Sequence, residues 1–142
     1  MIKGRCLCEQ VQYEIDGELG PVFNCHCSKC RRWHGAAFRT RASIGKAQFR
    51  LKSGKAYLSS YKSSDNVTKY FCKQCGSPLH SSYADNPDIL GIALGGLEGV
   101  TSIPEGHIFV GSKASWYDIA DTLPQYATWP GDENQVRQTS LP

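Results

Sequence analysis

The stretch "CHCSKC", from Cys25 to Cys30, places three cysteines within six positions of a 142-residue chain. It lies inside "NCHCSKCRRWHG" (residues 24–35), so two arginines follow the third cysteine at once. Three thiols are too many for one disulfide bond. Cysteines that only fill a core have no reason to crowd together beside positive charge. The stretch therefore indicates that the sulfurs have a chemical role. The other four cysteines help to identify which role.

All seven cysteines fall into three groups, "CLC", "CHCSKC" and "CKQC". In an extended segment, residues i and i+2 project to the same face, and a CxxC turn also presents two sulfurs to one ion. A structural zinc takes four ligands, whereas a catalytic zinc takes three protein ligands and keeps one open position. We therefore favour a closed four-thiolate site and an open three-thiolate site, made respectively by Cys6, Cys8, Cys72 and Cys75 and by Cys25, Cys27 and Cys30.

Other uses of the cysteines stay open at this point. A zinc ribbon could join the last two cysteines of "CHCSKC" to "CKQC", but it would leave three thiols unused and has an unusually long spacing. Disulfide bonds would leave one thiol over and need an oxidising compartment. A histidine such as His26 or His34 could close the three-thiolate site and make it purely structural.

Length and hydropathy indicate one domain in a reducing compartment. The N-terminal stretch "MIKGRCLCEQVQYEID" offers no apolar signal segment, and no run approaches the roughly 20 apolar residues of a membrane span. We expect a cytoplasmic protein without a membrane partner, in which CxxC pairs bind metal more often than they form disulfides. The polar stretch "GDENQVRQTSLP" predicts a tail over residues 131–142 and places the zinc-binding domain in residues 1–130.

Short apolar runs predict a mainly β domain. In "QVQYEID", Val11, Tyr13 and Ile15 alternate with polar residues, which is the period of a half-buried strand. Eight similar runs are bounded by Gly, Ser, Asn or Pro: "PVFNC", "AAFRTRASI", "AQFRL", "AYLSSY", "VTKYFC", "PLHSSY", "ILGIAL" and "GHIFVG". Little helix is expected, and "SKCRRW" could form a single turn.

Positive charge is concentrated around the triple cluster. Residues 21–64 contain 10 of the 16 basic residues and no acid, whereas 4 basic and 9 acidic residues follow. Such a segment could keep thiolates ionised or attract a small anion. With its interleaved aromatic residues it also raises an alternative function, a non-enzymatic zinc module that binds nucleic acid or protein. The acidic C-terminal half argues against nucleic acid.

The motifs "GRCLCEQVQYEI", "CHCSKCRRWHGAAF", "YFCKQCGSPL" and "GHIFVGSKASWYDIADTLPQY" together resemble the glutathione-dependent formaldehyde-activating enzyme family. That family shares its domain with centromere protein V. The resemblance implies a β-tent of antiparallel sheets with two zincs. The structural zinc would fall on the four paired cysteines, and the catalytic zinc would fall on Cys25, Cys27 and Cys30.

The resemblance also implies a zinc-dependent carbon–sulfur lyase or synthase, which joins glutathione and formaldehyde, or a related aldehyde, into S-(hydroxymethyl)glutathione. The expected partners are thus a small thiol and an aldehyde, and a thiol substrate could displace the second zinc. We expect Arg31, Arg32, Trp33 and His34 to contact the substrate. His26, His34 or His107 could carry a proton, but the pattern does not rank them, and it leaves the number of copies in an assembly open.

Overall fold

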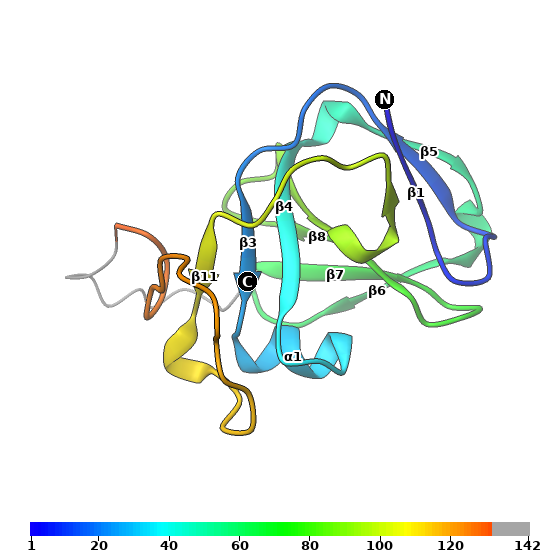
Figure 1. The fold of residues 1–142 in the computed structure, drawn as a ribbon. Coiled ribbons are helices and arrows are strands. Elements are labelled where there is room, and N and C mark those ends of the chain that lie inside the picture. The colour runs from blue at the N-terminus through cyan, green and yellow to red at the C-terminus, as the bar shows by residue number, and fades with distance from the viewer. Residues whose placement is uncertain (132–142) are drawn as a thin grey trace.

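Alternating apolar and polar residues build most of this protein as short strands, as the sequence predicts. The computed structural model describes residues 1–131 (Figure 1). Each of the nine predicted runs contains or overlaps a strand. The strands are β1 (Ile2–Arg5), β2 (Gln12–Ile15), β3 (Val22–Cys25), β4 (Arg39–Gly45), β5 (Phe49–Ser53), β6 (Leu58–Lys62), β7 (Val67–Cys72), β8 (Pro78–Tyr83), β9 (Ile89–Ala93), β10 (Leu97–Glu98) and β11 (Gly106–Ile108).

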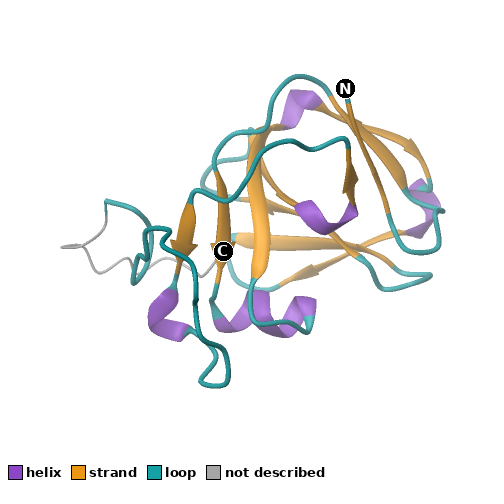
Figure 2. Ribbon diagram, viewed as in Figure 1, coloured by secondary structure: helices purple, strands orange, loops and turns teal. Residues whose placement is uncertain are grey.

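The strands form two sheets, which Figure 2 shows with few helical segments around them. One sheet has the order β10, β1, β2, β5, and the other has the order β11, β3, β4, β9, β8, β7, β6. The paired strands within residues 1–131 run antiparallel, with the exception of β3 and β11, which are parallel. This parallel pair brings residues 106–108 alongside the first part of the cysteine-rich segment.

Helix α1 (Ser28–His34) is longer than the single predicted turn. Its N-cap is Cys27, whose sulfur accepts a hydrogen bond from the Cys30 amide, and Gly35 ends it in the left-handed conformation that glycine adopts without steric cost. The short 3-10 helices are η1 (Lys46–Gln48), η2 (Lys55–Tyr57), η3 (Leu94–Gly96) and η4 (Val110–Ser112). Across residues 1–131, no helix has both the length and the apolar character needed to cross a membrane.

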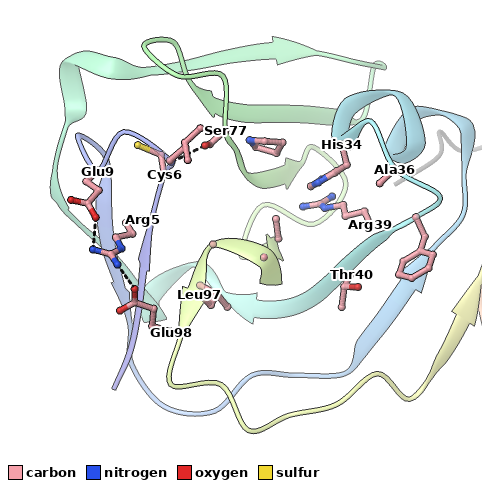
Figure 3. Close-up of a pocket in the computed structure, with 16 residues that line it drawn as sticks. Arg5, Cys6, Glu9, His34, Ala36, Arg39, Thr40, Ser77, Leu97 and Glu98 are labelled. Carbon is pink, nitrogen blue, oxygen red and sulfur yellow. Dashed lines mark hydrogen bonds and ion pairs between the residues drawn. The ribbon is translucent and has the colours of Figure 1, made fainter.

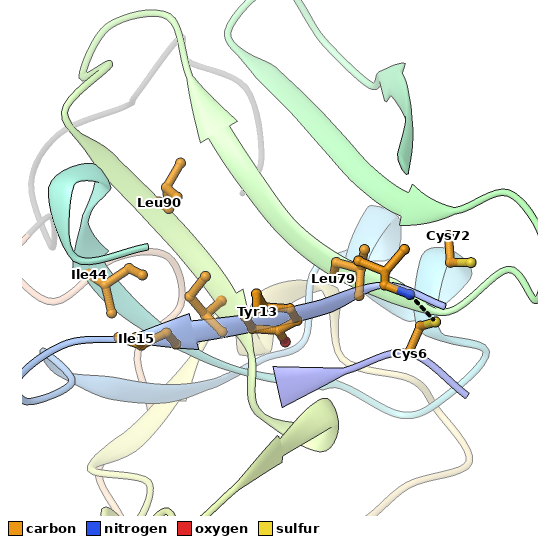
Figure 4. Close-up of a cluster of buried hydrophobic side chains, with 9 residues drawn as sticks. Cys6, Tyr13, Ile15, Ile44, Cys72, Leu79 and Leu90 are labelled. Atoms are coloured by element: carbon orange, nitrogen blue, oxygen red, sulfur yellow. Dashed lines mark hydrogen bonds between the residues drawn. The ribbon is translucent and has the colours of Figure 1, made fainter. Parts of the chain in front are cut away.

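The main core lies where the two sheets meet (Figure 4). Tyr13 and Ile15 of β2 pack there with Leu90 and Ile92 of β9, in agreement with the predicted inward face of "QVQYEID". Cys6 and Cys72 belong to the same buried cluster. A cysteine site is therefore built into the edge of the core rather than added to the surface. The predicted tail, apart from Gly131, lies outside the described residues, and the domain boundary stays a prediction.

His80 of β8 is buried in an aromatic environment. Its ring stacks on Tyr70 at 4.6 Å and lies 4.9 Å from Phe49, measured between ring centroids. Burial, aided by the positive charge of Arg39, lowers the pKa of His80 to about 4 from 6.5. The imidazole is therefore neutral in the folded protein at neutral pH, and acid favours the unfolded chain, where the ring can take up a proton.

We predict that His80→Phe reduces the loss of stability that follows acidification. Because the folded-state pKa is depressed, stability from this group is complete above pH 6.5 and falls as the pH drops below it. Between pH 7 and 5.5 the wild-type free energy of unfolding should fall by about 1 kcal/mol more than that of the variant. Urea unfolding at both pH values measures this difference, and equal losses in the two proteins would contradict the assignment.

Candidate metal centres

The four paired cysteines meet at one point, although up to 69 positions separate them in sequence. Cys6 and Cys8 follow β1, whereas Cys72 ends β7 and Cys75 lies in the turn after it. All four sulfur atoms lie within 4.8 Å of one another. The Sγ–Sγ distances are 3.5 Å between Cys6 and Cys8 and 3.8 Å between Cys8 and Cys72. Tetrahedral zinc thiolate, with bonds of 2.3 Å, requires sulfur separations of about 3.8 Å, so these residues fit zinc.

The turn after β7 is shaped to present its two sulfurs. Gly76 has φ +79°, and its amide donates to the Cys72 carbonyl at 2.7 Å. The hydroxyl of Ser77 contacts both halves of the site: it accepts from the Leu7 amide at 2.8 Å and lies 3.3 Å from the Cys75 sulfur. Burial acts to raise the pKa of Cys75, but hydrogen bonds with Ser77 and Cys8 together outweigh it and bring this pKa to about 5. Cys75 therefore favours the thiolate, the form that binds metal, whereas the pKa of its neighbour Cys8, which a backbone hydrogen bond acts to lower, is raised to about 12 by burial and by the other sulfurs of the group.

The other three cysteines form a second cluster, held by β3 and α1. Cys25 ends β3, Cys27 caps α1 and Cys30 lies in the first turn of this helix. Their sulfurs also lie within 4.8 Å of one another, and all three residues are fully buried. Ile108 and Phe109 pack against them from the β11 segment. Three thiols, with no fourth Cys, His, Asp or Glu of residues 1–131 in the group, match the donor set of a zinc site with an open position.

Two buried cations lie beside this three-thiol cluster. Arg39 is 1% exposed and Lys69 is 3% exposed. Hydrogen bonds with Cys25 and Cys27 lower the pKa of Cys30 well below its ordinary value, and the charges of Arg39 and Lys69 lower it further. Burial lowers the pKa of Lys69, while the nearby thiolates oppose that shift. The cluster therefore carries negative charge that the protein itself compensates.

Arg39 lies between the three-thiol cluster and a cavity. In the antiparallel pair of β3 and β4 it lies opposite Cys25. Its guanidinium donates to the Gly91 carbonyl at 2.7 Å and to the Ser81 hydroxyl at 3.1 Å. It also lines a cavity of about 620 Å³, here called the Arg39 cavity, whose other lining residues include His34, Phe38 and Ser77. A cavity of this size holds a small organic substrate.

The two ends of the Arg39 cavity differ in character (Figure 3). His34 and Arg39 lie at one end, and Arg5 lies at the other, paired with Glu9 at 2.5 Å and with Glu98 at 2.7 Å. Burial, followed by the charge of Arg39, lowers the pKa of His34 to about 4, so its ring is neutral at pH 7. The His34 Nε2 atom is buried and has no hydrogen-bond partner within the described part of the chain.

Two of the candidate proton carriers form a chain with an acid that the sequence did not single out. The His26 Nε2 atom lies 2.8 Å from His107 Nδ1, and His107 Nε2 lies 2.9 Å from an Asp121 carboxylate oxygen. The chain joins the loop between β3 and α1 to β11 and the segment after it. Burial and the neighbouring His107 lower the pKa of His26 to about 4. These contacts orient the segment that carries Cys25 and Cys27.

The four residues predicted to contact substrate do not share one cavity. His34 lines the Arg39 cavity, whereas Arg32 and Trp33 line a different one on another face of α1. The carbonyl of Arg31 accepts the hydrogen bond that ends the helix, from the Gly35 amide. Sequence reasoning missed Lys69, although one signal was available: this lysine occupies an inward position of "VTKYF", where the alternation with Val67 and Phe71 predicts an apolar residue.

Comparison with known proteins gives consistent results. A family model described as "Glutathione-dependent formaldehyde-activating enzyme" matches residues 1–112. A Schizosaccharomyces pombe protein, named an uncharacterized lyase, is 28% identical over 127 residues, which cover 87% of this chain and 89% of that protein. A crystal structure of a Rhodobacter sphaeroides protein superposes with a TM-score of 0.59 at 29% identity, over 72% of this chain and 97% of the other.

We predict that Cys72→Ser removes one bound zinc per chain and destabilises the fold. The substitution leaves three ligands and a buried hydroxyl in a site that ties the N-terminus to the end of β7. Loss of a structural metal costs more than about 4 kcal/mol, which corresponds to a fall in Tm of roughly 10 °C or more. Elemental analysis and thermal unfolding followed by circular dichroism measure both effects.

Lys73→Gln is the matched control for this substitution, since it changes an exposed residue of the same turn. It should keep the zinc content and Tm of the wild-type protein. A Cys72→Ser protein with unchanged zinc content and unchanged Tm would refute a structural role for the four-cysteine site.

Proposed function

This chain belongs to the glutathione-dependent formaldehyde-activating enzyme family, and we propose that it is a zinc-dependent carbon–sulfur lyase. Its substrates would be a small thiol, glutathione in the first place, and formaldehyde or a related aldehyde. The S. pombe relative, which is named a lyase, supports this reaction class. The observation that carries the proposal is the buried three-thiol cluster, with two compensating cations, beside a cavity of about 620 Å³.

We propose two zincs per chain, with different duties. Four ligands would close the structural site, and three would leave an open position at the second site. When bound there, zinc would supply a Lewis acid that favours the thiolate form of a substrate thiol. The ligands would be Cys6, Cys8, Cys72 and Cys75 at the structural site and Cys25, Cys27 and Cys30 at the catalytic site.

The chain's own residues would prepare the cluster for an additional sulfur. A fourth thiolate adds negative charge to a group of three, which costs free energy in a buried site. Arg39 and Lys69 lower this cost because their positive charges act on Cys30 from within the protein. Hydrogen bonds to Ser81 and Gly91 hold the guanidinium of Arg39 in place, so it need not reorganise when substrate binds.

The Arg39 cavity would hold the substrates so that a carbon–sulfur bond can form. The thiol sulfur attacks the aldehyde carbon, the S–H bond breaks, and the proton is transferred to the aldehyde oxygen, which yields the hydroxymethyl thioether. The reverse sequence cleaves the adduct. His34 is the best placed of the candidate proton carriers, because it lines the cavity and its buried Nε2 atom has no partner among residues 1–131.

Burial and ion pairing of the basic segment support an enzyme over a nucleic-acid-binding module. Arg39 and Arg41 are buried, so their charges do not reach the surface. Arg50 pairs with Asp16 at 2.8 Å, and Lys52 lies 3.5 Å from Glu14. The 10 basic residues of the segment therefore do not form one continuous surface for a polyanion.

We predict that Cys27→Ser abolishes turnover but leaves a folded protein. The variant would lose one ligand of a local site, while the four-cysteine site that ties the fold together remains intact. Formation of S-(hydroxymethyl)glutathione should fall by more than roughly 100-fold, which exceeds the effect of losing an outer-shell partner. The measurement is a coupled assay of adduct formation with glutathione and formaldehyde.

Zinc content and Tm serve as controls for this variant. Cys27→Ser should contain one zinc per chain instead of two and should unfold near the wild-type Tm. Dialysis of the wild-type protein against glutathione should weaken retention of one zinc and leave the other in place. A fully active Cys27→Ser protein would refute the catalytic role of the cluster.

A further inference from the structure

A second cavity, here called the Trp33 cavity, opens on a different face of α1 from the one that carries His34. Its volume is about 530 Å³, within the range of small-ligand sites. Helix α1, strands β6 and β7 and the turn after β7 form its walls. The lining residues are Lys29, Arg32, Trp33, Tyr61, Ser63, Lys69, Phe71 and Gly76.

Helix periodicity and strand register explain why these residues converge. Lys29, Arg32 and Trp33 are spaced i, i+3 and i+4, and therefore share one face of α1. On the sheet, Tyr61 lies directly opposite Lys69, and Phe71 follows two positions later on the same face. The Lys29 ammonium donates to the Ser63 carbonyl at 2.9 Å, which ties the helix to the loop between the two strands.

Aromatic rings and positive charge make up most of this lining. Trp33, Tyr61 and Phe71 contribute three rings, and Tyr61 is 67% exposed, so part of the aromatic surface is open to solvent. Lys29, Arg32 and Lys69 contribute three cations, and among residues 1–131 no Asp or Glu lines the cavity. The Lys69 ammonium lies 4.6 Å from the centroid of the Trp33 ring. The cavity thus combines an apolar wall with a positive field.

We propose that the Trp33 cavity binds a small carboxylate that carries an aromatic ring. The ring would pack against Trp33 and Tyr61, where offset or edge-to-face contact is favourable. The carboxylate would accept hydrogen bonds from Arg32, whose planar guanidinium suits two oxygens, and from the remaining N–H groups of Lys29. This binding site goes beyond the thiol chemistry of the Arg39 cavity, since the two cavities share no lining residue in the described part of the chain, although Lys69 of the Trp33 cavity also lies beside the three-thiol cluster.

The distribution of positive charge around the Trp33 cavity favours a small ligand over a nucleic acid. A strand of nucleic acid needs a row of exposed cations along its backbone, whereas Lys69 is 3% exposed and lies inside the cavity wall. Beyond the cavity, Arg50 and Lys52 are paired with acids of β2 and its following turn. A ligand with one ring and one carboxylate can pair with the cations inside the cavity and needs none beyond it.

The experiment compares two ligands of the same size on the zinc-loaded, full-length protein. Phenylacetate carries the ring and the charge, and phenylacetamide carries the ring alone. Titration followed by Trp fluorescence and by calorimetry should show phenylacetate binding about tenfold more tightly, the effect of one charge-assisted contact of roughly 1.4 kcal/mol. Acetate, which lacks the ring, should bind more weakly than either of them.

Variants then locate the binding site. Arg32→Gln should weaken phenylacetate about three- to tenfold and leave phenylacetamide unchanged, whereas Trp33→Leu should weaken both ligands. Lys55→Gln, an exposed basic residue outside the cavity, is the matched control and should change neither affinity. Equal affinities for acid and amide, or an Arg32→Gln protein that binds phenylacetate as the wild type does, would overturn the proposal. Tighter binding of a thymidine hexanucleotide than of phenylacetate would overturn it in favour of a nucleic-acid site.

Discussion

Positive charge buried beside sulfur is the constraint on which this structure depends. An unpaired ammonium or guanidinium in a protein interior costs several kcal/mol, yet Arg39 and Lys69 are almost fully enclosed. Within the three-cysteine group, Cys30 supplies the compensating negative charge, since hydrogen bonds with Cys25 and Cys27 and then the charges of the two cations lower its pKa. Because Arg39 comes from β4, Lys69 from β7 and the thiols from β3 and α1, this mutual dependence holds the large sheet and the helix in one arrangement.

The two cysteine groups differ in their surroundings and in the roles that we propose for them. The four-cysteine group joins segments far apart in sequence at the edge of the main core, and its partners, such as Ser77, serve to fix the geometry of a turn. The three-cysteine group is local in sequence, but its surroundings are not: Arg39 connects it to the cavity that would receive substrate, and His26 connects it to His107 and Asp121. The chemistry of the three-cysteine group can therefore change without loss of the structural role of the four-cysteine group.

The local sequence pattern was enough to predict most of the strands. Features that depend on contacts between residues far apart in the sequence could not be predicted from it. Alternating runs revealed nine strands, but β1 and β10 went unnoticed because the first is rich in exposed charge and the second has two residues. Counting ligands joined the same cysteines that the structure brings together. The parallel pairing of β3 with β11 depends on residues far along the chain. Alternation in β7 places Lys69 on the inward face, but the thiols that compensate its charge lie on β3 and α1, so the local pattern does not show what a buried lysine would contact.

The cover of the three-cysteine group comes from the end of the described chain. Ile108 accepts a hydrogen bond from the His26 amide, and Tyr126 and Trp129 pack against the cluster. A ribosome makes Cys30 about a hundred residues before Trp129, which at 5 to 20 residues per second is an interval of roughly 5 to 20 s. During that interval the thiols are already local to one another and still uncovered. A metal ion can thus enter the nascent chain through a face that later synthesis encloses.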